Sequence, residues 1–281
     1  MIVASGIGSA SVVPVGGWVA LNAAFPAASN PNKRIRITDY GYPITFISNG
    51  TEYVPDGGQA TLALSGIGYG IMPSGTVSAG ASGHFTLPGG SALPHTYSAG
   101  LWMYFAANAI VTPNLSAGFY WCVFSSATVC TIYSNGPGSA AINFSVGGAV
   151  TGYFGAEVTA RSVTIPAGLM GENGQLSSDS LSGCQASAYA KTVRLKLGNS
   201  TVTSSVSTTP SLSIMGSTAT SNSNASLQYS RPVYTGSTST SSVSRTTIDT
   251  TAATTYSLTL QMAVATEYII NHNFRLDLFK A

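Results

Sequence analysis

Three carboxylates that lie near one another along the chain are the first candidates for catalytic chemistry. Asp39, Glu52 and Asp56 belong to one short stretch, and a convergent pair of carboxylates can serve as the acid and base of a hydrolase. Asp39 and Asp56, however, stand just before Gly41 and Gly57, and Asp close to Gly is typical of turns. We therefore predict that these acids shape turns and do not catalyse a reaction.

The remaining residues add little catalytic potential. The sequence has nine acidic residues and three histidines, His84, His95 and His272. His272 lies between two asparagines, which favours a surface or interface role over that of a base. The sequence contains no Gly-x-Ser-x-Gly elbow, no phosphate-binding loop and no metal-ligand spacing. We predict a protein that is not an enzyme and that takes no cofactor or metal.

Aromatic side chains offer a different chemistry, which is the stacking of sugar rings. Trp102, Tyr120 and Trp121 lie in the aromatic segments LWMYF (101–105) and FYWCVF (119–124). Aromatic strands this dense are more typical of a core or an interface, and we prefer that interpretation. Contact of Trp102, Tyr120 and Trp121 with a glycan or a partner protein is the alternative.

The cysteines indicate neither a disulfide scaffold nor a zinc site, because their number is odd and their spacing is wide. They are Cys122, Cys130 and Cys184. Cys122 and Cys130 would face each other on neighbouring strands, but we expect buried free thiols. Free thiols suit assembly in a reducing cytoplasm.

The composition is poor in charge. Charged residues make up 7% of the chain, whereas about 25% is usual. A folded chain of this kind is expected to bury much of its surface against other subunits, although a surface of Ser and Thr hydroxyls is an alternative. The net charge is +2, and the small basic cluster at 33–36 fits a solvated strand edge better than a phosphate site. We expect a homo-oligomer that binds no nucleic acid.

The N-terminal stretch has an unusual composition. Residues 1–31 are small, apolar and Gly-rich, and Lys33 is the first charged residue. Prolines such as Pro14 and Pro26 interrupt this stretch, so we predict neither a signal peptide nor membrane insertion. We expect residues 1–31 to be an extended attachment arm that a partner orders.

Strands must position all of these residues, because the period of the apolar pattern is two in most segments. Residues 32–65 read as a small β-meander, in which Asn49-Gly50 predicts a hairpin with a type I′ turn. Residues 66–98 are rich in Gly, Ser and Pro and are predicted to be a linker or a set of long loops. Residues 99–160 form an aromatic β-region.

Residues 161–281 are predicted to form one β-sandwich. Within it, Ser and Thr dominate from Asn199 to Ser226, where embedded apolar residues favour hydroxyl-faced strands over disorder. The alternation at 256–264 and 268–278 predicts two adjacent antiparallel strands, the second lying inside a sheet. Arg231 and Asp249 are expected to form a partly buried ion pair that fixes two loop connections of this sandwich. With no pattern for a helix longer than about two turns, the predicted fold class is all-β.

Three groups of motifs resemble virion proteins of tailed bacteriophages. The first is FPAASN (25–30) with RITD (36–39) and the hairpin FISNG…YVP (46–55); the second runs from Ala107 to Tyr133. The third is TIPAG (164–168) with Gly171, Asn173, Gly174, Arg231, Ile248, Asp249, Thr254, Thr255 and Gln261. In the hairpin of the first group, Asn49 and Tyr53 stand where the virion proteins usually have Asp and Trp. Where those virion proteins commonly carry a cluster of aromatic and charged residues, this chain has residues 177–190. The resemblance therefore does not predict the local loop or its partner.

The resemblance implies a structural protein of the virion, assembled in the host cytoplasm. It would be a tail, collar or head appendage with a jelly-roll-like C-terminal sandwich, and residues 1–31 would contact other virion proteins. A trimer is implied by the resemblance alone. Two alternatives stay open, which are an adhesin that binds a host surface glycan and a decoration protein that cements the capsid.

Overall fold

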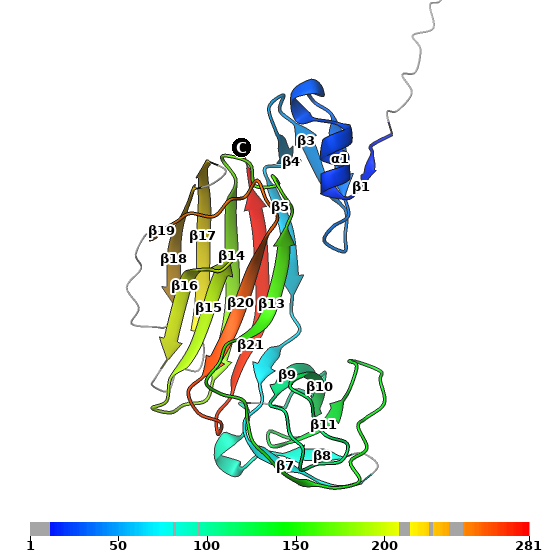
Figure 1. The fold of residues 1–281 in the computed structure, drawn as a ribbon, viewed down its shortest axis with the longest axis vertical. Helices are drawn as coiled ribbons and strands as arrows, with labels where there is room; N and C mark the ends of the chain where they lie inside the picture. Colours follow the sequence, from blue (N-terminus) through cyan, green and yellow to red (C-terminus); the bar gives the residue numbers. More distant parts are fainter. Residues whose placement is uncertain are drawn as a thin grey trace, which may run out of the picture.

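The structure is a computed structural model, and its fold class is all-β, as the sequence predicts. It describes residues 12–80, 83–94, 96–207, 214–224, 227–235 and 244–280, and for residues 207, 214–224, 227–235 and 244–246 it describes the backbone alone. The described residues form three sheets, of 4, 13 and 4 strands. Figure 1 shows an elongated molecule with a small N-terminal module at one end, a β-sandwich in the middle and a distal β-region at the other end.

The N-terminal module is a four-stranded sheet covered by a short helix. Its elements are β1 (Val15–Gly16), α1 (Trp18–Ala24), η1 (Ala27–Ser29), β2 (Arg34–Ile37), β3 (Ile44–Ser48) and β4 (Tyr53–Pro55). The expected extended arm over residues 1–31 is therefore wrong for residues 12–31, because Trp18 is buried against Phe46 and Tyr53. Burial of this indole gives the segment a partner within its own chain. Residues 1–11 lie outside the described residues.

The hairpin predicted at Asn49-Gly50 forms, but its turn is of a different type. Gly50 has a positive φ of 94°, whereas Asn49 does not, so the two residues do not make a type I′ turn. The Asn49 carboxamide oxygen accepts hydrogen bonds from the backbone amides of Thr51 and Glu52, at 2.9 Å each. This side chain closes a longer loop, which is a common use of Asn in turns.

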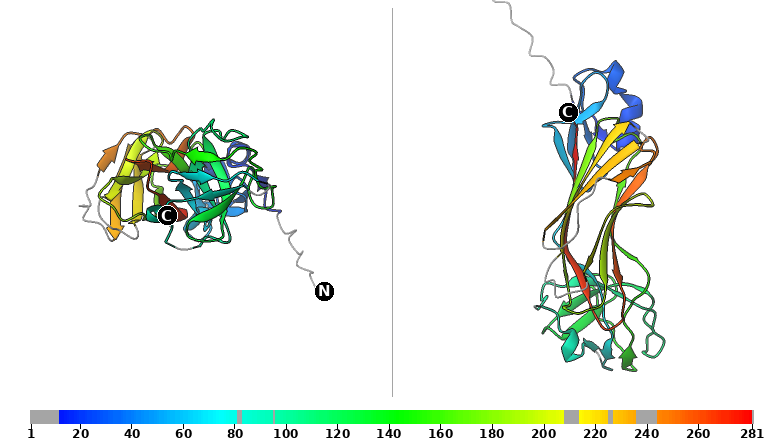
Figure 2. Two further views of the ribbon diagram at one scale, coloured as in Figure 1. Left: turned by 90° about the horizontal axis from the view of Figure 1, so that it is seen from below. Right: turned by 90° about the vertical axis from the view of Figure 1, so that its left-hand side faces the viewer.

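Two sheets pack face to face in the sandwich, as the two layers in Figure 2 show. One sheet has the order β13-β20-β15-β16, with bounds Val158–Ile165, Thr254–Met262, Lys191–Leu197 and Ser200–Ser207. The other is part of the large sheet and comprises β5 (Gln59–Ser65), β21 (Ile269–Phe279), β14 (Gln175–Cys184), β17 (Ile214–Asn224), β18 (Leu227–Thr235) and β19 (Ser244–Thr246). β16 and β17 confirm that the Ser/Thr-rich segment contains strands.

The last two long strands are not adjacent, which corrects the prediction from their alternation. β20 pairs with β13 and β15, while β21 pairs with β14, β5 and β6 (Tyr69–Ile71). Sandwich layers are about 10 Å apart, and the six-residue link between Met262 and Ile269 is long enough to cross from one layer to the other. β21 does lie inside its sheet, as the sequence predicts.

The distal region extends the large sheet beyond the sandwich. It comprises β6, β7 (Gly75–Val77), β8 (His84–Thr86), η2 (Gly89–Ser91), β9 (Leu101–Phe105), β10 (Gly118–Phe124), β11 (Val129–Tyr133) and β12 (Gly148–Val150). Residues 66–98 are thus not merely a linker or loops, because three of these strands lie there. β6 connects the two parts, since it pairs with β21 on one side and with β9 on the other.

A continuous core joins the N-terminal module to the sandwich. Trp18 and Phe46 belong to the same buried cluster as Leu258 and Leu276, whereas the distal region has its own cluster around Phe85. The Trp18 indole also donates a 3.0 Å hydrogen bond to the carbonyl of Ala167.

An ion pair reinforces this junction. Lys280 is buried and lies 2.6 Å from Glu52 of the module. Burial lowers the pKa of Lys280 more than Glu52 raises it. Gly171 makes this approach possible, because a Cβ at that position would meet the Glu52 carboxylate.

Charges on the outer face of the smaller sandwich sheet form a network around Glu157. This carboxylate lies 2.7 Å from Arg194 and 2.6 Å from Lys196, both on β15. Burial raises the pKa of Glu157, but the hydrogen bond from Lys196 and the charges of Arg194 and Lys196 outweigh it, and the pKa is lowered overall. The folded protein therefore keeps Glu157 ionised at pH values that protonate it in the unfolded chain.

Glu157 should make stability depend on pH. Because its folded pKa is depressed, its contribution is fully present above the unfolded pKa and is lost as the pH falls through the folded pKa. We expect Glu157→Gln to lower the free energy of unfolding by on the order of 1 kcal/mol near neutral pH, and by progressively less as the pH falls through the folded pKa. Urea denaturation of both proteins across this range measures the difference, and a difference that does not change with pH would contradict the assignment.

Candidate functional site

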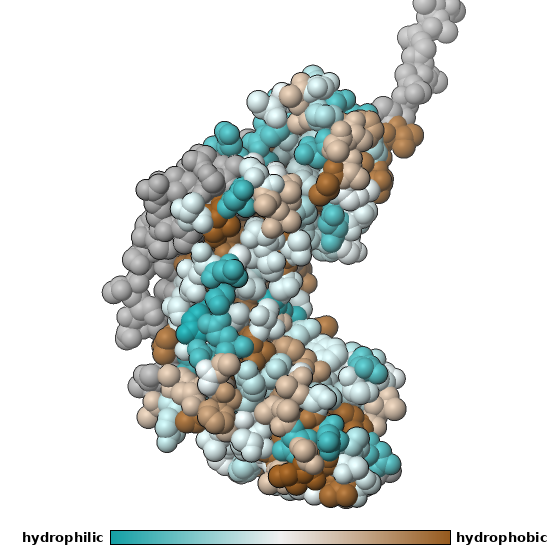
Figure 3. Space-filling model, viewed as in Figure 1, coloured by the Kyte–Doolittle hydropathy of each residue, from teal (hydrophilic) through white to brown (hydrophobic). Residues whose placement is uncertain are grey.

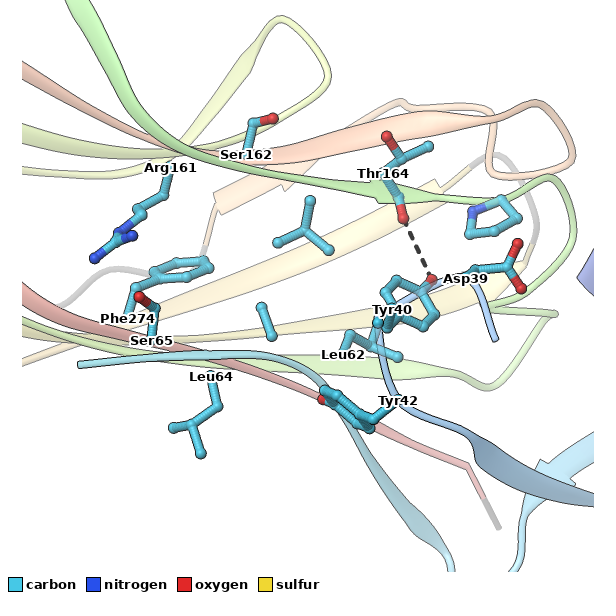
Figure 4. Close-up of a pocket in the computed structure, with 14 residues that line it drawn as sticks. Asp39, Tyr40, Tyr42, Leu62, Leu64, Ser65, Arg161, Ser162, Thr164 and Phe274 are labelled. Carbon is cyan, nitrogen blue, oxygen red and sulfur yellow. Dashed lines mark hydrogen bonds between the residues drawn. The ribbon is translucent and has the colours of Figure 1, made fainter. Parts of the chain in front are cut away.

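A hollow occupies one side of the elongated molecule, between the N-terminal module and the distal region (Figure 3). At its floor lies a slot of about 600 Å³, whose two walls are residues 62–65 of β5 and residues 161–164 of β13. The loop that contains Asp39, Tyr40 and Tyr42 closes one end, and Arg161 lies at the other (Figure 4). Phe274 of β21 contributes to the floor. The slot is therefore the open edge of the sandwich.

The two walls are edge strands. Among the described residues β5 pairs with β21 and β13 pairs with β20, each on one side. An edge strand presents backbone amides and carbonyls that are not used by a neighbouring strand. The slot is consequently lined by hydrogen-bonding backbone as well as by side chains.

Two tyrosines from the N-terminal module satisfy one carbonyl on each wall. The Tyr40 hydroxyl donates to the carbonyl of Thr164 on β13 at 3.3 Å, and the Tyr42 hydroxyl donates to the carbonyl of Thr61 on β5. Burial raises the pKa of Tyr40, and Asp39 and Tyr42 raise it further. Burial, and then Asp277, raise the pKa of Tyr42. Both hydroxyls therefore stay protonated and act as donors at ordinary pH.

Arg161 links the slot to the aromatic side chains of the distal region. Its guanidinium lies 3.9 Å from the ring centroid of Tyr69 and donates to the carbonyl of Ile67. Burial lowers the pKa of Arg161, while Tyr69 opposes this shift. The Nε of Arg161 is buried and has no hydrogen-bond acceptor among the described residues. This nitrogen is an unused donor at the end of the slot.

An aromatic face continues from Tyr69 across the distal sheet. Tyr69 stacks on Trp102 with centroids 6.2 Å apart and meets Phe119 edge-on at 5.2 Å. Trp102 in turn contacts Trp121 at 5.5 Å. This "aromatic face" comprises Tyr69, Trp102, Tyr104, Phe119, Trp121 and Tyr153, and several of its rings pack toward the sandwich core. The face thus fills the junction between the two parts, and all of its rings except that of Trp121 are half-buried.

Trp102, Tyr120 and Trp121, which the sequence suggests as one contact surface, differ in the sheet face they occupy and in their exposure. Trp102 and Trp121 are register partners on one face of the sheet. Trp102 is half-buried, but Trp121 is 5% exposed and is therefore a packing residue. Tyr120 points to the opposite face, where its ring packs on Phe105 and its hydroxyl binds the backbone of Ser116. Trp102 is the one of the three with appreciable exposed area on the aromatic face.

The three acids at 39–56 do not converge. Asp39 accepts a 2.8 Å hydrogen bond from the backbone amide of Trp18, Glu52 pairs with Lys280, and Asp56 pairs with Arg34 at 3.2 Å. Each carboxylate serves a separate structural contact, and Asp39 and Asp56 stand in turns, as the sequence predicts.

The histidines and cysteines also have separate places. His272 stacks on Tyr97 with centroids 6.0 Å apart, and His84 is exposed on β8, whereas His95 lies outside the described residues. Cys122, Cys130 and Cys184 are buried free thiols, as predicted. Burial, followed by a hydrogen bond with Cys130, raises the pKa of Cys122.

The predicted Arg231–Asp249 ion pair stays a prediction, because the side chain of Arg231 lies outside the described residues. Asp249 is exposed and accepts hydrogen bonds from the backbone and side chain of Thr251. These bonds lower the pKa of Asp249. The carboxylate thereby shapes the turn that leads into β20.

Comparison with known proteins does not assign the chain to a group. No family model matches the sequence, and no curated protein is significantly similar to it. In the part of the chain that the structure describes, no three His, Cys, Asp or Glu residues gather in a way that suits a metal ion. No helix among the described residues is long and apolar enough to cross a membrane.

Proposed function

We propose that the protein is a non-catalytic structural component of a tailed-bacteriophage virion, most simply a tail, collar or head appendage. The observation that carries this proposal is the arrangement along the long axis (Figure 1). A small module is fixed to one end of a sandwich by a shared core and a partly buried ion pair. A separate β-region extends from the other end. Such a rod suits a subunit that is anchored at one end and projects at the other.

The motif resemblance supports the same proposal, because its first and third groups coincide with the module and the sandwich. We include two further points in the proposal, which are that the sandwich has a jelly-roll-like topology, as the resemblance implies, and that the protein is located in the virion. The separate structural partners of Asp39, Glu52 and Asp56 support a passive role over hydrolysis.

We further propose that the chain assembles as a homo-oligomer, with three copies favoured. The support is the low charge content of 7%, together with exposed apolar residues that flank the slot. Leu64 is 73% exposed and Ile67 is 47% exposed, which is typical of surface that another subunit covers. Light scattering on the purified protein tests this: we expect the mass of three copies of the 28.7 kDa chain, and a monomer at all concentrations would refute it.

Binding of a host surface glycan is a second candidate function, which the half-buried rings of the aromatic face favour. Trp102 is partly exposed beside Tyr69, and an aromatic side chain with exposed area can stack on a sugar ring. We expect Trp102→Ala to weaken binding to any glycan that an array identifies by about tenfold, equivalent to ~1.4 kcal/mol. Ile110→Ala, at an exposed apolar residue outside the face, is the matched control. Equal binding by both variants would remove the aromatic face from this role.

A further inference from the structure

The slot has the features of a receptor for one extended strand. Its walls are the free edges of β5 and β13, and an exposed sheet edge can accept an extended segment as an additional strand. The segments of the walls that line the slot, residues 62–65 and 161–164, are four residues long, which is about 13 Å in a strand. A short stretch of polypeptide is therefore enough to fill it.

The direction of the backbone groups identifies β13 as the better edge. The carbonyl of Thr164 faces the slot, because the Tyr40 hydroxyl donates to it. Backbone groups alternate in direction along a strand, so the amide and carbonyl of Ser162 face the slot too. The register between β13 and β20 is regular from Arg161 to Ile165, which keeps this alternation intact. β5 is less regular, since its register with β21 shifts between Leu276 and Asp277.

The walls also specify the chemistry of the segment. Between Asp39 at one end and Arg161 at the other, the lining has no charged residue and includes Leu62, Val163 and Phe274. An uncharged strand with small and branched apolar residues fits such a lining, whereas a charged strand would lose hydration without gaining a partner.

We propose that residues 1–11 of a second copy of the chain occupy the slot as a strand along β13. This inference rests on the oligomeric assembly proposed above. Residues 1–11 (MIVASGIGSAS) have no charged side chain, contain no proline and carry branched apolar residues at Ile2, Val3 and Ile7. They match the lining in charge and size, and the slot needs fewer residues than the segment provides.

The entry of the chain into the N-terminal module favours a second copy as the acceptor. β1 runs parallel to β2, with Val15 beside Arg36 and Gly16 beside Ile37. β2 leads toward the loop at 39–42 that closes the slot, so the chain before Val15 leads away from the slot of its own molecule. Val13 accordingly lies beside Lys33 and Arg34 at the far end of β2. We therefore place the acceptor slot on a neighbouring copy.

Proline at Ser162 gives a selective test, together with a deletion of residues 1–11. Ser162→Pro removes the amide that would bind the incoming strand, but this amide faces away from β20, so the sheet itself is retained. Ser162→Ala keeps the amide and is the matched control. We expect the deletion and Ser162→Pro to shift the mass in solution from the oligomer to one chain, with circular dichroism unchanged, and Ser162→Ala to keep the wild-type mass.

A synthetic peptide of residues 1–11 provides a second readout that does not depend on oligomerisation. We expect it to bind the deleted chain and to bind at least tenfold more weakly when that chain also carries Ser162→Pro. If the deletion variant is still oligomeric and the peptide does not bind, the slot proposal is wrong, but the proposed oligomer is retained. A monomeric wild type that binds no peptide overturns both.

Discussion

Replacing Lys191 by methionine is expected to lower the free energy of unfolding by about 3–5 kcal/mol. Lys191 is fully buried at the start of β15, and its ammonium lies 2.8 Å from the carboxylate of Glu267, which is 5% exposed. Removal of the lysine leaves Glu267 buried without its counter-ion, and an unpaired buried charge costs far more than the pair contributes. Chemical denaturation of the two proteins measures the change.

Two controls separate this burial effect from the loss of a charge as such. Arg34→Met breaks the ion pair with Asp56, whose members are 56% and 41% exposed, and should cost at most about 1 kcal/mol. The double variant Lys191→Met, Glu267→Leu removes both buried charges and should recover most of the stability lost in the single variant. A single variant as stable as the wild type would show that the pair is not buried in solution.

Replacing Trp18 by alanine is expected to cost about 3–5 kcal/mol and to release the N-terminal module from the sandwich. Trp18 is 2% exposed, packs on Phe46 and Tyr53, and donates to Ala167 of the sandwich. The substitution therefore leaves a large cavity and an unpaired carbonyl at the junction. Limited proteolysis should show faster cleavage within residues 12–58, while the sandwich resists digestion as before.

Val19→Ala is the matched control for Trp18. Val19 follows Trp18 in the same helix but is 63% exposed, so its truncation should change stability by no more than about 0.5 kcal/mol. Similar proteolysis of both variants would indicate that Trp18 does not hold the module in place.

The strands themselves were largely predictable, because a strand with one buried face has a period of two. Val193, Leu195 and Leu197 are buried on β15, as their alternation indicates. Alternation does not identify the partner of a strand, however. β20 and β21 alternate equally well, but each pairs with strands that are distant in sequence, so their adjacency could not be predicted from their closeness along the chain.

The candidate site was less predictable for the same reason. Arg161, Tyr40 and Phe274 come from three separate parts of the chain and meet only because two sheets stack. For the aromatic residues a signal did exist, since Tyr120 and Trp121 are consecutive in a strand and must point to opposite faces. Which of those faces would be covered depends on the sandwich, which the local sequence does not determine.

Labelling of the N-terminal module on intact particles tests the central claim most directly. A gold label on the N-terminal module, imaged by electron microscopy on phage particles that contain the protein, should lie where an appendage joins the particle, with the distal region pointing outward. Absence of the protein from purified particles, or a label at the free tip of the appendage, would contradict the account.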